Sequence, residues 1–318
     1  MSDLSILPEK FFDGWNKKNS VLAIVGPTAS GKSSLAFKVA ELTGGEIVSC
    51  DSMQVYRGMD IGTAKPTPEE MAAVRHHLID VADPDQPFSC ADYTRLARAA
   101  IDRILSAGRL PIICGGTGLY YESAIRGRTM ESPGGDPELR KRLESVGPEE
   151  NYARLCEADP ESAAKIHPNN VKRVIRALEI YMVSGVTKTE WDRRSTEKNC
   201  GYDTHTVVLE ASDRDYLYRR IDARVDKMIS DGLEDEVRRL SPDRSSTAGQ
   251  AIGYKEFCEY FRGECSVAEA AENIKRASRN YAKRQITWFK RYDDVLRLDI
   301  CAPGFPDDFV KLLLKNIC

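Results

Sequence analysis

Residues 21–33 of the sequence, VLAIVGPTASGKS, combine an apolar run with a glycine-bounded loop that ends in a lysine and a serine. The spacing Gly26-x-x-x-x-Gly31-Lys32-Ser33 is that of a P-loop, which is typical of nucleotide-binding proteins, ATP-binding ones included. Its glycines allow backbone N–H groups to converge on phosphate oxygens, and Lys32 adds a positive charge. The hydroxyl of Ser33 suits a Mg²⁺ ion that also binds the phosphates. The motif predicts a di- or triphosphate site without identifying the compound.

Two further segments place candidate residues at the ends of predicted strands. A short strand at Glu46–Ser49 leads to Asp51, and a buried-looking strand at Leu110–Cys114 leads to a glycine-rich turn that contains Thr117. Ligand-binding groups gather at strand ends in open α/β sheets, so Asp51 is a candidate for chemistry. Thr117 is expected to face the same crevice, with a plain tight connection to the next helix as the alternative.

The composition is that of a soluble globular protein with one large or two ordinary domains. The chain has 318 residues, of which 42% are hydrophobic and 30% charged, and its net charge is −3. We find neither an apolar stretch of membrane-spanning length nor a signal-peptide pattern, and we therefore expect a cytoplasmic protein without membrane contact. The nine cysteines form no C-x-x-C pair, and the four histidines lack metal-ligand spacing, which argues against a zinc site.

The order of predicted elements indicates an α/β fold, with a P-loop core whose mostly parallel sheet is flanked by helices. From about residue 127 the pattern changes, and Asp136–Ser184 has a helical period throughout. Thr206–Leu209 then returns to strand character. We therefore predict an inserted all-helical domain that interrupts the core. The expected parts are 1–126, the first part of the core; 127–200, the helical insertion; and 201–318, the second part of the core with basic C-terminal helices.

Two arginine pairs lie at helical spacing. Arg173 and Arg176 stand three apart in the insertion, where a solvated basic face is the alternative to a binding role. Arg220 and Arg224 stand four apart on a predicted helix at 213–231. They are suited to clamp a phosphate or carboxylate, although they are also consistent with surface ion pairs.

The segment Glu272–Arg291 carries seven basic residues and one acidic residue, and it interleaves Tyr281, Trp288 and Phe289. Basic residues alternating with aromatic ones at this spacing fit either a nucleic-acid backbone or a helix with one buried and one solvated face. The sequence pattern leaves both interpretations open.

Together these motifs resemble those of the tRNA dimethylallyltransferase (tRNA isopentenyltransferase) family, over almost the whole chain. The matching segments are GPTASGKS at 26–33, DSMQVYRGMDIGTAKP at 51–66, HHLID at 76–80, GGTGLYY at 115–121, KRVIRALEIY at 172–181, QAIGYKE at 250–256 and YAKRQITWFKR at 281–291. The resemblance implies transfer of a dimethylallyl group from dimethylallyl diphosphate to N6 of the adenosine 3′-adjacent to a tRNA anticodon. The P-loop would then hold dimethylallyl diphosphate rather than ATP, with Mg²⁺ as the cofactor.

The resemblance also implies roles for individual residues. The diphosphate would lie on the P-loop residues Gly26, Pro27, Thr28, Ala29, Ser30, Gly31, Lys32 and Ser33, with Mg²⁺ at Ser33. Catalysis would involve Asp51, Thr117 and an arginine, either Arg220 or Arg224. The anticodon stem-loop would be contacted by Asp51, Ser52, Met53, Gln54, Thr117, Arg140, Lys172, Arg173, Val174, Ile175, Arg176, Gln250, Ala251, Ile252, Gly253, Tyr254, Lys255, Lys283, Arg284, Gln285, Ile286, Thr287, Trp288, Phe289 and Lys290.

The chemistry gives Asp51 a specific role. The N6 amine of adenine is a poor nucleophile, so a base that accepts its proton should assist the transfer. The target base must leave its stack to reach Asp51, and we expect a channel between the core and the insertion. An adenylate isopentenyltransferase, a P-loop kinase and an ATP-gated nucleic-acid-binding module are the alternatives. The insertion and the basic C-terminal helix favour tRNA, and we expect a monomer.

Overall fold

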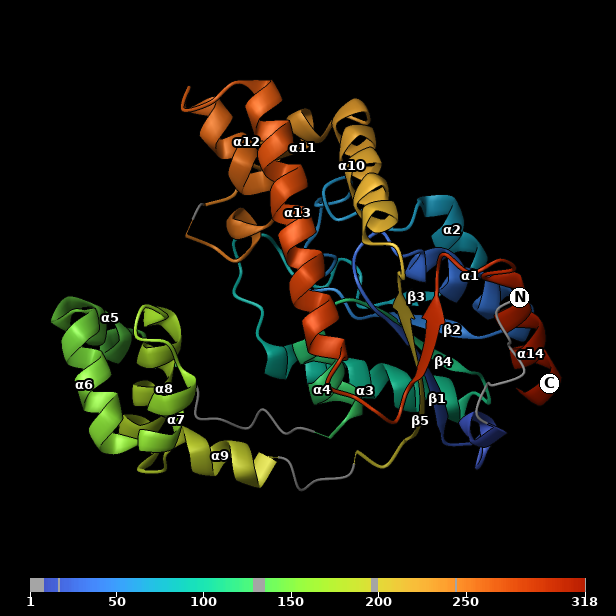
Figure 1. Ribbon diagram of the computed structural model, residues 1–318, viewed down its shortest axis with the longest axis horizontal. Helices are drawn as coiled ribbons and strands as arrows, with labels where there is room; N and C mark the ends of the chain where they lie inside the picture. The colour runs from blue at the N-terminus through green and yellow to red at the C-terminus, as the bar shows by residue number, and fades with distance from the viewer. Residues whose placement is uncertain (1–8, 17, 128–134, 196–199, 244, 318) are drawn as a thin grey trace. The chain divides into compact units, whose positions relative to one another are not determined.

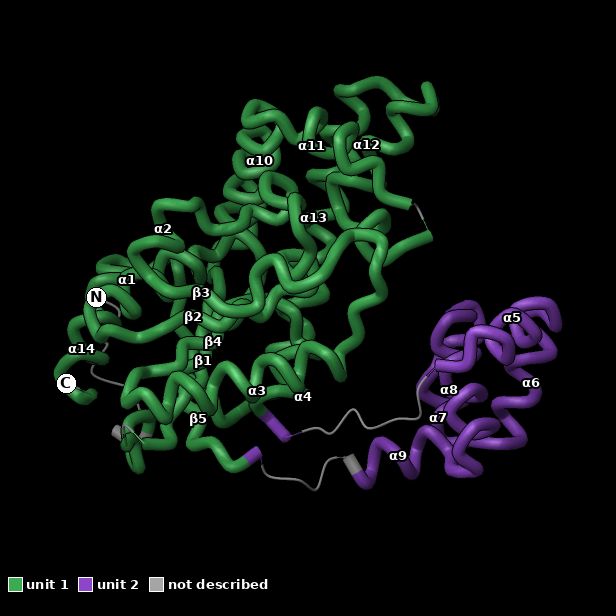
Figure 2. Tube along the Cα trace, turned by 180° about the vertical axis from the view of Figure 1, so that it is seen from behind, with its two compact units in different colours: residues 1–125, 201–318 green, residues 126–200 purple. Residues whose placement is uncertain are grey.

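The computed structural model describes residues 9–16, 18–127, 135–195, 200–243 and 245–317. The chain divides into two compact units, which Figure 2 colours separately. Unit 1 comprises Met1–Ile125 and Gly201–Cys318, and unit 2 comprises Arg126–Cys200. The predicted ends of the helical insertion lie within one residue of this division.

Unit 1 is built on a parallel sheet (Figure 1), which confirms the predicted α/β class. Within the described residues the sheet has six strands in the order β3-β2-β4-β1-β5-β6, and every pair of neighbours runs parallel. The strands are β1 (Ser20–Val25), β2 (Glu46–Ser49), β3 (His76–His77), β4 (Pro111–Gly115), β5 (Asp203–Glu210) and β6 (Leu296–Asp299). Every residue of β1 is buried, as expected of a strand covered on both faces. The P-loop therefore follows an interior strand.

Helices cover both faces of the sheet and extend beyond it. Those of unit 1 are α1 (Lys32–Thr43), α2 (Pro68–Ala73), α3 (Cys90–Ser106), α4 (Gly118–Ile125), α10 (Arg214–Ser230), α11 (Leu233–Leu240), α12 (Tyr254–Phe261), α13 (Val267–Phe289) and α14 (Asp307–Ile317), with short 3₁₀ turns at Glu9–Phe12 and Ala248–Gln250. The sequence predicts an amphipathic helix at Phe88–Ala107 that Ser89 opens. The start of α3 confirms this, because Ser89 accepts a hydrogen bond from the backbone N–H of Asp92 in a capping box.

Three apolar clusters hold unit 1 together. One packs α1, α10 and α14 against one face of the sheet, with Leu22 and Ile24 at its centre. A second packs α3 and α4 against the other face, around Val21 and Ala23. A third joins α10, α11, α12 and α13 to the loop that follows β2. This third cluster anchors the C-terminal helices, including the long α13, beside the carboxyl ends of the strands.

The sequence at His77–Val81 could also form a short strand, but the observed strand β3 has different bounds. Pairing with β2 is confined to His76 and His77, because Leu78 and Asp80 adopt left-handed backbone conformations with φ of 62° and 56°. The chain then turns, and the N–H groups of Val81 and Ala82 bond to the carbonyl oxygen of Val55. The segment after β3 thus supports the loop around residue 55 instead of extending the sheet.

Unit 2 is helical in its described residues, as predicted. Its helices are α5 (Pro137–Val146), α6 (Pro148–Ala158), α7 (Pro160–Lys165), α8 (Val171–Ser184) and α9 (Lys188–Ser195). Proline occupies the first turn of α5, α6 and α7, where its missing N–H costs nothing. Leu143, Leu155, Val174 and Leu178 form its core. Across both units, none of the helices that the structure describes is long and apolar enough to cross a bilayer.

Candidate active site

The P-loop lies between β1 and α1, beside the end of β5. Gly26 has a φ of 141°, and a Cβ at this position would lie 2.5 Å from the carbonyl oxygen of Leu209, so a larger residue does not fit. Gly31 has a φ of 90° and forms the N-cap of α1. The positive end of α1 and its first N–H groups therefore meet at the loop, which is the arrangement that binds phosphate.

Lys32 folds back over the loop. Its Nζ donates a hydrogen bond to the carbonyl oxygen of Pro27, and the side chain is buried. Burial lowers the pKa of Lys32 to about 8, although the carboxylate of Asp51 acts in the opposite direction. An anion bound at the P-loop would restore the positive charge, since a nearby opposite charge favours the protonated amine.

Gln285 on α13 ties the P-loop to the turn after β4. Its Oε1 accepts a hydrogen bond from the backbone N–H of Thr28 at 2.8 Å, and its Nε2 donates to the carbonyl oxygen of Gly116 at 3.0 Å. A Cβ on Gly116 would lie 2.1 Å from that amide nitrogen, so the glycine is required for the contact. The basic C-terminal helix is thereby attached directly to the phosphate-binding loop.

Both candidate arginines on α10 reach the P-loop. Arg220 Nε donates to the carbonyl oxygen of Ala29 at 2.8 Å, and Arg224 Nη1 donates to Thr28 Oγ1 at 3.0 Å. Arg220 is exposed, whereas Arg224 is partly buried and lines the cavity described below. Burial lowers the pKa of Arg224, and Asp51 opposes this effect. The geometry favours Arg224 for a ligand inside the cavity, whereas Arg220 contacts the P-loop from an exposed position.

A cavity of about 480 Å³ opens beside the P-loop within unit 1. Its volume lies in the range of small-molecule sites. It brings together residues that are far apart in the sequence and that were singled out as site residues. These are Thr28, Lys32, Ser33, Asp51, Ser52, Met53, Gln54, Arg224, Gln250, Ala251, Ile252, Gly253, Arg284 and Gln285.

Asp51 lies at the start of the loop after β2, on the cavity wall. Its Oδ1 accepts hydrogen bonds from the backbone N–H groups of Met53 at 2.8 Å and Gln54 at 3.4 Å, which fixes the carboxylate in an Asx turn. Thr117 lies close by, because its Oγ1 accepts from the N–H of Ser52 at 3.0 Å. Thr117 thus lies beside the Asp51 loop, and its expected place in the crevice of the P-loop stays a prediction.

Tyr281 of α13 lines the same cavity, on the side where Asp51 and Thr117 meet. Burial and, to a smaller extent, the Asp51 carboxylate raise its pKa to about 12, and a hydrogen bond with Thr117 acts in the opposite direction. The guanidinium of Arg284 lies 5.4 Å from the centre of its ring. The phenol is thus a neutral hydrogen-bonding group beside the candidate base.

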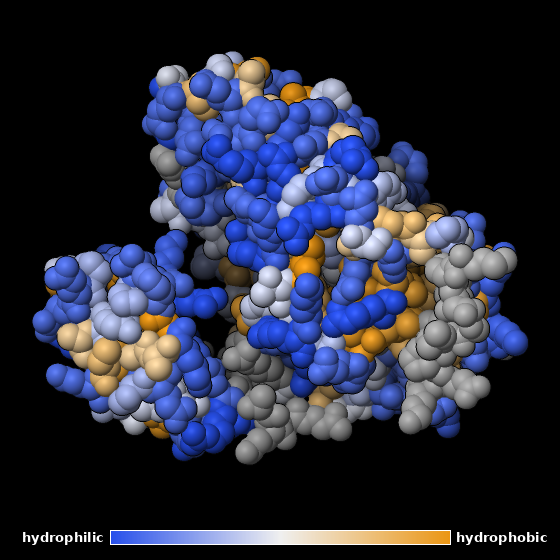
Figure 3. Space-filling view, viewed as in Figure 1, coloured by the Kyte–Doolittle hydropathy of each residue, from blue (hydrophilic) through white to orange (hydrophobic). Residues whose placement is uncertain are grey.

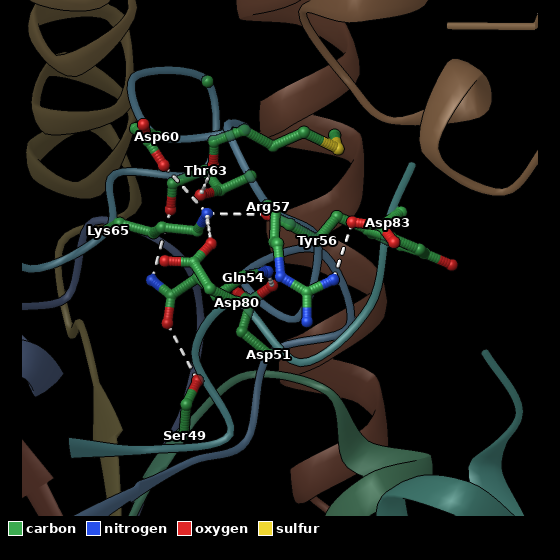
Figure 4. Close-up of polar contacts among 12 residues, drawn as sticks. Ser49, Asp51, Gln54, Tyr56, Arg57, Asp60, Thr63, Lys65, Asp80 and Asp83 are labelled. Atoms are coloured by element: carbon green, nitrogen blue, oxygen red, sulfur yellow. Dashed lines mark hydrogen bonds and ion pairs between the residues drawn. The ribbon is translucent and has the colours of Figure 1, made fainter. Parts of the chain in front are cut away.

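The loop of residues 60–66 forms another part of the wall and is held by the buried ammonium of Lys65. Lys65 Nζ bonds to Asp60, to Asp80 and to the carbonyl oxygen of Tyr56 (Figure 4). Its side chain is only 3% exposed. The motif that ends in TAKP therefore contributes a structural lysine to the site.

Gln54 links this loop to β2. Its Oε1 accepts from Ser49 Oγ at 2.8 Å, and its Nε2 donates to the carbonyl oxygens of Thr63 and Ala64 (Figure 4). Both ends of its amide are therefore engaged within the protein. The predicted contact of Gln54 with RNA stays a prediction, and the structure adds a positioning role.

Glu236 of α11 fastens the 60–66 loop to α12. Its carboxylate accepts hydrogen bonds from three successive backbone N–H groups, those of Asp60, Ile61 and Gly62, at 2.8–3.0 Å. Tyr254 donates its phenol hydrogen to the same carboxylate at 2.6 Å. Both Glu236 and Tyr254 are buried. One carboxylate thus fixes two segments that line the cavity.

Several residues carried over as RNA contacts have buried side chains. They are Val174, Ile175, Ala251, Tyr254, Gln285 and Phe289. Six of the carried-over cationic residues are instead exposed, namely Arg140, Lys172, Arg173, Lys283, Arg284 and Lys290, and so is Thr287. Ile286, Trp288 and Lys255 are intermediate. The buried members of these motifs position their neighbours, whereas the exposed members present charge.

Part of the basic excess of the segment Glu272–Arg291 is neutralised by neighbouring acids. Lys275 pairs with Asp226 at 2.7 Å, Arg279 with Asp222 at 2.5 Å, and Arg291 with Glu122 at 2.9 Å. The count of seven basic residues and one acidic residue in the sequence segment does not include these acids, because two of them lie on α10 and one lies on α4. The surface over α10–α13 is nevertheless largely hydrophilic (Figure 3).

The remaining predicted contacts lie in unit 2. Arg140 on α5 and Arg176 on α8 both bond to Glu179, whose carboxylate is buried. Arg173 lies one turn from Arg176 on α8 and is exposed. The insertion therefore brings Arg140 close to the arginines of the KRVIR motif.

Sequence reasoning missed Glu236, Lys65, Glu179 and the hydroxyl of Tyr281 as parts of these sites. Lys65 and Glu179 lie inside two of the motifs that resemble the family. Their charge within these motifs could have marked them as site residues. Glu236 offered none, because its bonds to residues 60–62 span 174 to 176 positions of sequence.

Comparisons with known proteins agree with this geometry. The family model described as IPP transferase matches residues 54–292. The tRNA dimethylallyltransferase of Geobacillus thermodenitrificans is 49% identical over 289 residues, which cover 89% of this chain and 91% of that protein.

Solved structures are similar as well. The tRNA isopentenylpyrophosphate transferase of Bacillus halodurans is 41% identical, with a TM-score of 0.68 over 94% of this chain and 97% of that one. A eukaryotic dimethylallyltransferase described as acting on tRNA is 29% identical, with a TM-score of 0.79 over 94% of this chain and 79% of that one.

Proposed function

Since the chain belongs to the IPP transferase family, we propose that it transfers a dimethylallyl group from dimethylallyl diphosphate to N6 of the adenosine 3′-adjacent to the anticodon of tRNA. The products are N6-dimethylallyladenosine and diphosphate. One observation carries the proposal: the P-loop and the carboxylate of Asp51 line the same cavity. The P-loop can thereby bind the diphosphate while Asp51 accepts a proton from the adenosine in the same cavity.

The P-loop is the proposed site of the diphosphate. The N–H groups at the start of α1, Lys32 and Arg224 supply donors and positive charge, and Arg220 lies at the edge of the loop. These groups stabilise the negative charge that develops on the leaving diphosphate. Thr117 is within reach of the Asp51 loop and supports its backbone through Ser52.

Mg²⁺ is the proposed cofactor. The Ser33 hydroxyl is a hard oxygen ligand that lines the cavity, and it fits this ion. In the described part of the chain, no group of three or more His, Cys, Asp or Glu side chains could hold a metal ion. This composition suits an ion held mainly by phosphate oxygens and water, as Mg²⁺ commonly is. When bound, it would neutralise charge on the diphosphate.

Asp51 is the proposed base. As the bond from N6 to the allylic carbon forms, the bond from that carbon to the diphosphate oxygen breaks, and the electron pair leaves with the diphosphate. The N6 proton passes to the Asp51 carboxylate. The two N–H groups that bond to Oδ1 hold the carboxylate in place for this transfer.

The proposed macromolecular partner is the anticodon stem-loop of tRNA. Exposed cationic residues on α8, on α13 and at the C-cap of α13, among them Lys172, Arg173, Lys283 and Lys290, can contact the RNA backbone. The adenine would be flipped out of its stack to reach Asp51. We further propose that the enzyme acts as a monomer in the cytoplasm, where its tRNA substrates occur.

An adenylate isopentenyltransferase would use the same cradle and base on AMP, ADP or ATP. The basic surfaces of unit 2 and α13 favour tRNA, since a free nucleotide would not need them.

The test is an incubation of the protein with Mg²⁺ and dimethylallyl diphosphate, with either unmodified tRNA that carries the target adenosine or free AMP, ADP and ATP. The nucleosides are then analysed by mass spectrometry. We expect the adduct on tRNA alone. An adduct on free nucleotides alone would move the protein to the adenylate-modifying enzymes, and ATP consumption without any adduct would refute the proposed reaction.

A further inference from the structure

Glu179 occupies an unusual position in unit 2, because one buried carboxylate serves two arginines from different helices. Arg140 Nη2 lies 3.1 Å from Oε1 and 3.0 Å from Oε2, and Arg176 Nη1 lies 2.6 Å from Oε2. The backbone N–H of Asp136 completes the set with a 2.9 Å bond to Oε1. The carboxylate is therefore saturated with donors, and it links the start of α5 to the middle of α8.

The acid of this cluster is buried, whereas both of its arginines are partly exposed. The side chain of Glu179 is 0% exposed, whereas those of Arg140 and Arg176 are 48% and 33% exposed. The arginines thus meet the acid at its buried end and still reach solvent. Burial tends to raise the pKa of Glu179, but the bonds from Arg176 and Arg140 hold it below its usual value.

The surroundings on α8 are basic. Lys172 and Arg173 are exposed, and they lie four and three positions before Arg176, so all three side chains share one region of the helix surface. No acidic residue occurs in the first turn of α8. The side chains of Arg140, Arg176 and Glu179 comprise two guanidinium groups and one carboxylate. This surface suits an anionic polymer.

We infer that Glu179 is a positioning residue that presets the guanidinium groups of Arg140 and Arg176 for contact with the tRNA backbone. This inference rests on the proposed function, because it concerns the same RNA substrate. A free arginine side chain loses rotamer entropy when it binds a phosphate, and an arginine already held in place loses less. The acid would therefore strengthen RNA binding although its own charge is repelled by RNA.

In the alternative, Glu179 only forms a structural ion pair. The two interpretations predict opposite changes in tRNA affinity when Glu179 is neutralised. Removing a negative charge from an RNA-binding surface should by itself leave the affinity unchanged or raise it. Loss of positioning should lower it. The dissociation constant of the tRNA complex therefore shows which of the two effects dominates.

The experiment measures tRNA binding by the full chain over a range of salt concentrations for the wild type and for Glu179→Gln, Glu179→Asp and Glu157→Gln. Glu157 is an exposed acid on α6, so Glu157→Gln is matched in charge. Circular dichroism reports whether each variant is folded. Binding of dimethylallyl diphosphate reports on the unit 1 cavity.

We expect Glu179→Gln to weaken tRNA binding about tenfold and to reduce the salt dependence by one to two released counterions, roughly as for the loss of one or two phosphate contacts. Glu179→Asp keeps the charge but is one methylene shorter, and it should also weaken binding. Glu157→Gln should bind tRNA as well as the wild type or better. Dimethylallyl diphosphate affinity should be the same in all four proteins.

Two outcomes would overturn the inference. The first is that folded Glu179→Gln binds tRNA as tightly as Glu157→Gln. The second is that both Glu179 variants lose the helical signal of unit 2, which would make the acid a folding residue. A wild-type protein that binds dimethylallyl diphosphate but not tRNA would instead refute the proposed function itself.

Discussion

Gln285 accepts a hydrogen bond from the backbone N–H of Thr28 across 257 positions of sequence. This contact joins the long C-terminal helix α13 to the P-loop, and the same amide also donates to the carbonyl oxygen of Gly116. The helix that carries the basic residues is therefore in direct contact with the loop proposed to bind diphosphate. We therefore expect a change in α13 at Gln285 to alter the P-loop.

Replacing Gln285 with leucine should impair diphosphate binding. The variant keeps a similar volume but leaves the N–H of Thr28 and the carbonyl of Gly116 without this partner. The expected losses are about tenfold in affinity for dimethylallyl diphosphate and about 1–3 kcal/mol in the free energy of unfolding. Calorimetry and urea denaturation measure the two quantities. Asn280→Leu, at an exposed position of the same helix, serves as the control and should change neither. Wild-type affinity in Gln285→Leu would refute the coupling.

The two arginines of α10 should differ in their importance. Arg224 lines the cavity, so Arg224→Ala should lower kcat/KM by roughly 10- to 100-fold, the range expected for a lost hydrogen bond to a charged group. Arg220→Ala should cost less than about tenfold, since Arg220 is exposed at the edge of the loop. Steady-state kinetics with varied dimethylallyl diphosphate measure both effects. The reverse ranking would show that Arg220 is the diphosphate-binding arginine.

Diphosphate binding should depend on the protonation of Lys32. Its pKa is about 8, because burial disfavours the ammonium, and a bound anion raises that value. Below about pH 8 the amine is already charged. Above it, binding must take up a proton, so the affinity should fall by up to about tenfold per pH unit. A prenyl diphosphate is a suitable ligand, because its last ionisation lies near pH 6, well below this range.

Calorimetry in two buffers of different ionisation enthalpy measures this proton uptake directly. The variant Lys32→Met should bind weakly at every pH and show no uptake. Lys38→Met removes a lysine from the same helix that pairs with Asp307, and it should behave as the wild type. Proton uptake that persists in Lys32→Met would assign the titration to another group.

Glu236 should be needed for the wall of the cavity. In Glu236→Gln, one carboxylate oxygen becomes an amide that cannot accept from the N–H groups of residues 60–62. We expect a loss of about 1–3 kcal/mol in the free energy of unfolding, together with a higher KM for tRNA, because residues 60–66 and 250–253 lose their common support.

Urea denaturation and kinetics check the Glu236 prediction. Tyr254→Phe removes only one of the bonds to this acid and should cost about 1 kcal/mol. Asp235 is an exposed neighbour of Glu236 on α11, and Asp235→Asn should change neither the stability nor the KM for tRNA. A Glu236→Gln variant as stable as Asp235→Asn would contradict the role assigned to the carboxylate.

Local patterns explain why much of the fold could be predicted. The P-loop, the strand at Glu46–Ser49 and the cap at Ser89 are specified by residues within a few positions of one another. The observed elements match them: β2 has the predicted bounds, and Ser89 caps α3. The parallel sheet followed from the alternation of strands and helices.

Long-range contacts explain what could not be predicted. The bonds of Gln285 and Glu236 depend on how distant segments pack, which no local pattern contains. The short strand that the sequence allows at 77–81 does not form over that range, because two non-glycine residues adopt left-handed conformations that sequence propensity disfavours. The acids that neutralise α13 lie on α4 and α10, so a count along one helix missed them.

The most direct test of the account is the rate of dimethylallyl transfer by Asp51→Asn in a single turnover with saturating tRNA and dimethylallyl diphosphate. The amide keeps the shape of the carboxylate but cannot accept the N6 proton as a base. We predict a rate at least about 100-fold below that of the wild type, with tRNA affinity preserved within about threefold. Asp83→Asn, which alters an acid paired with Arg57, should retain full activity. An Asp51→Asn enzyme that keeps most of the wild-type rate would contradict the assignment of Asp51 as the base.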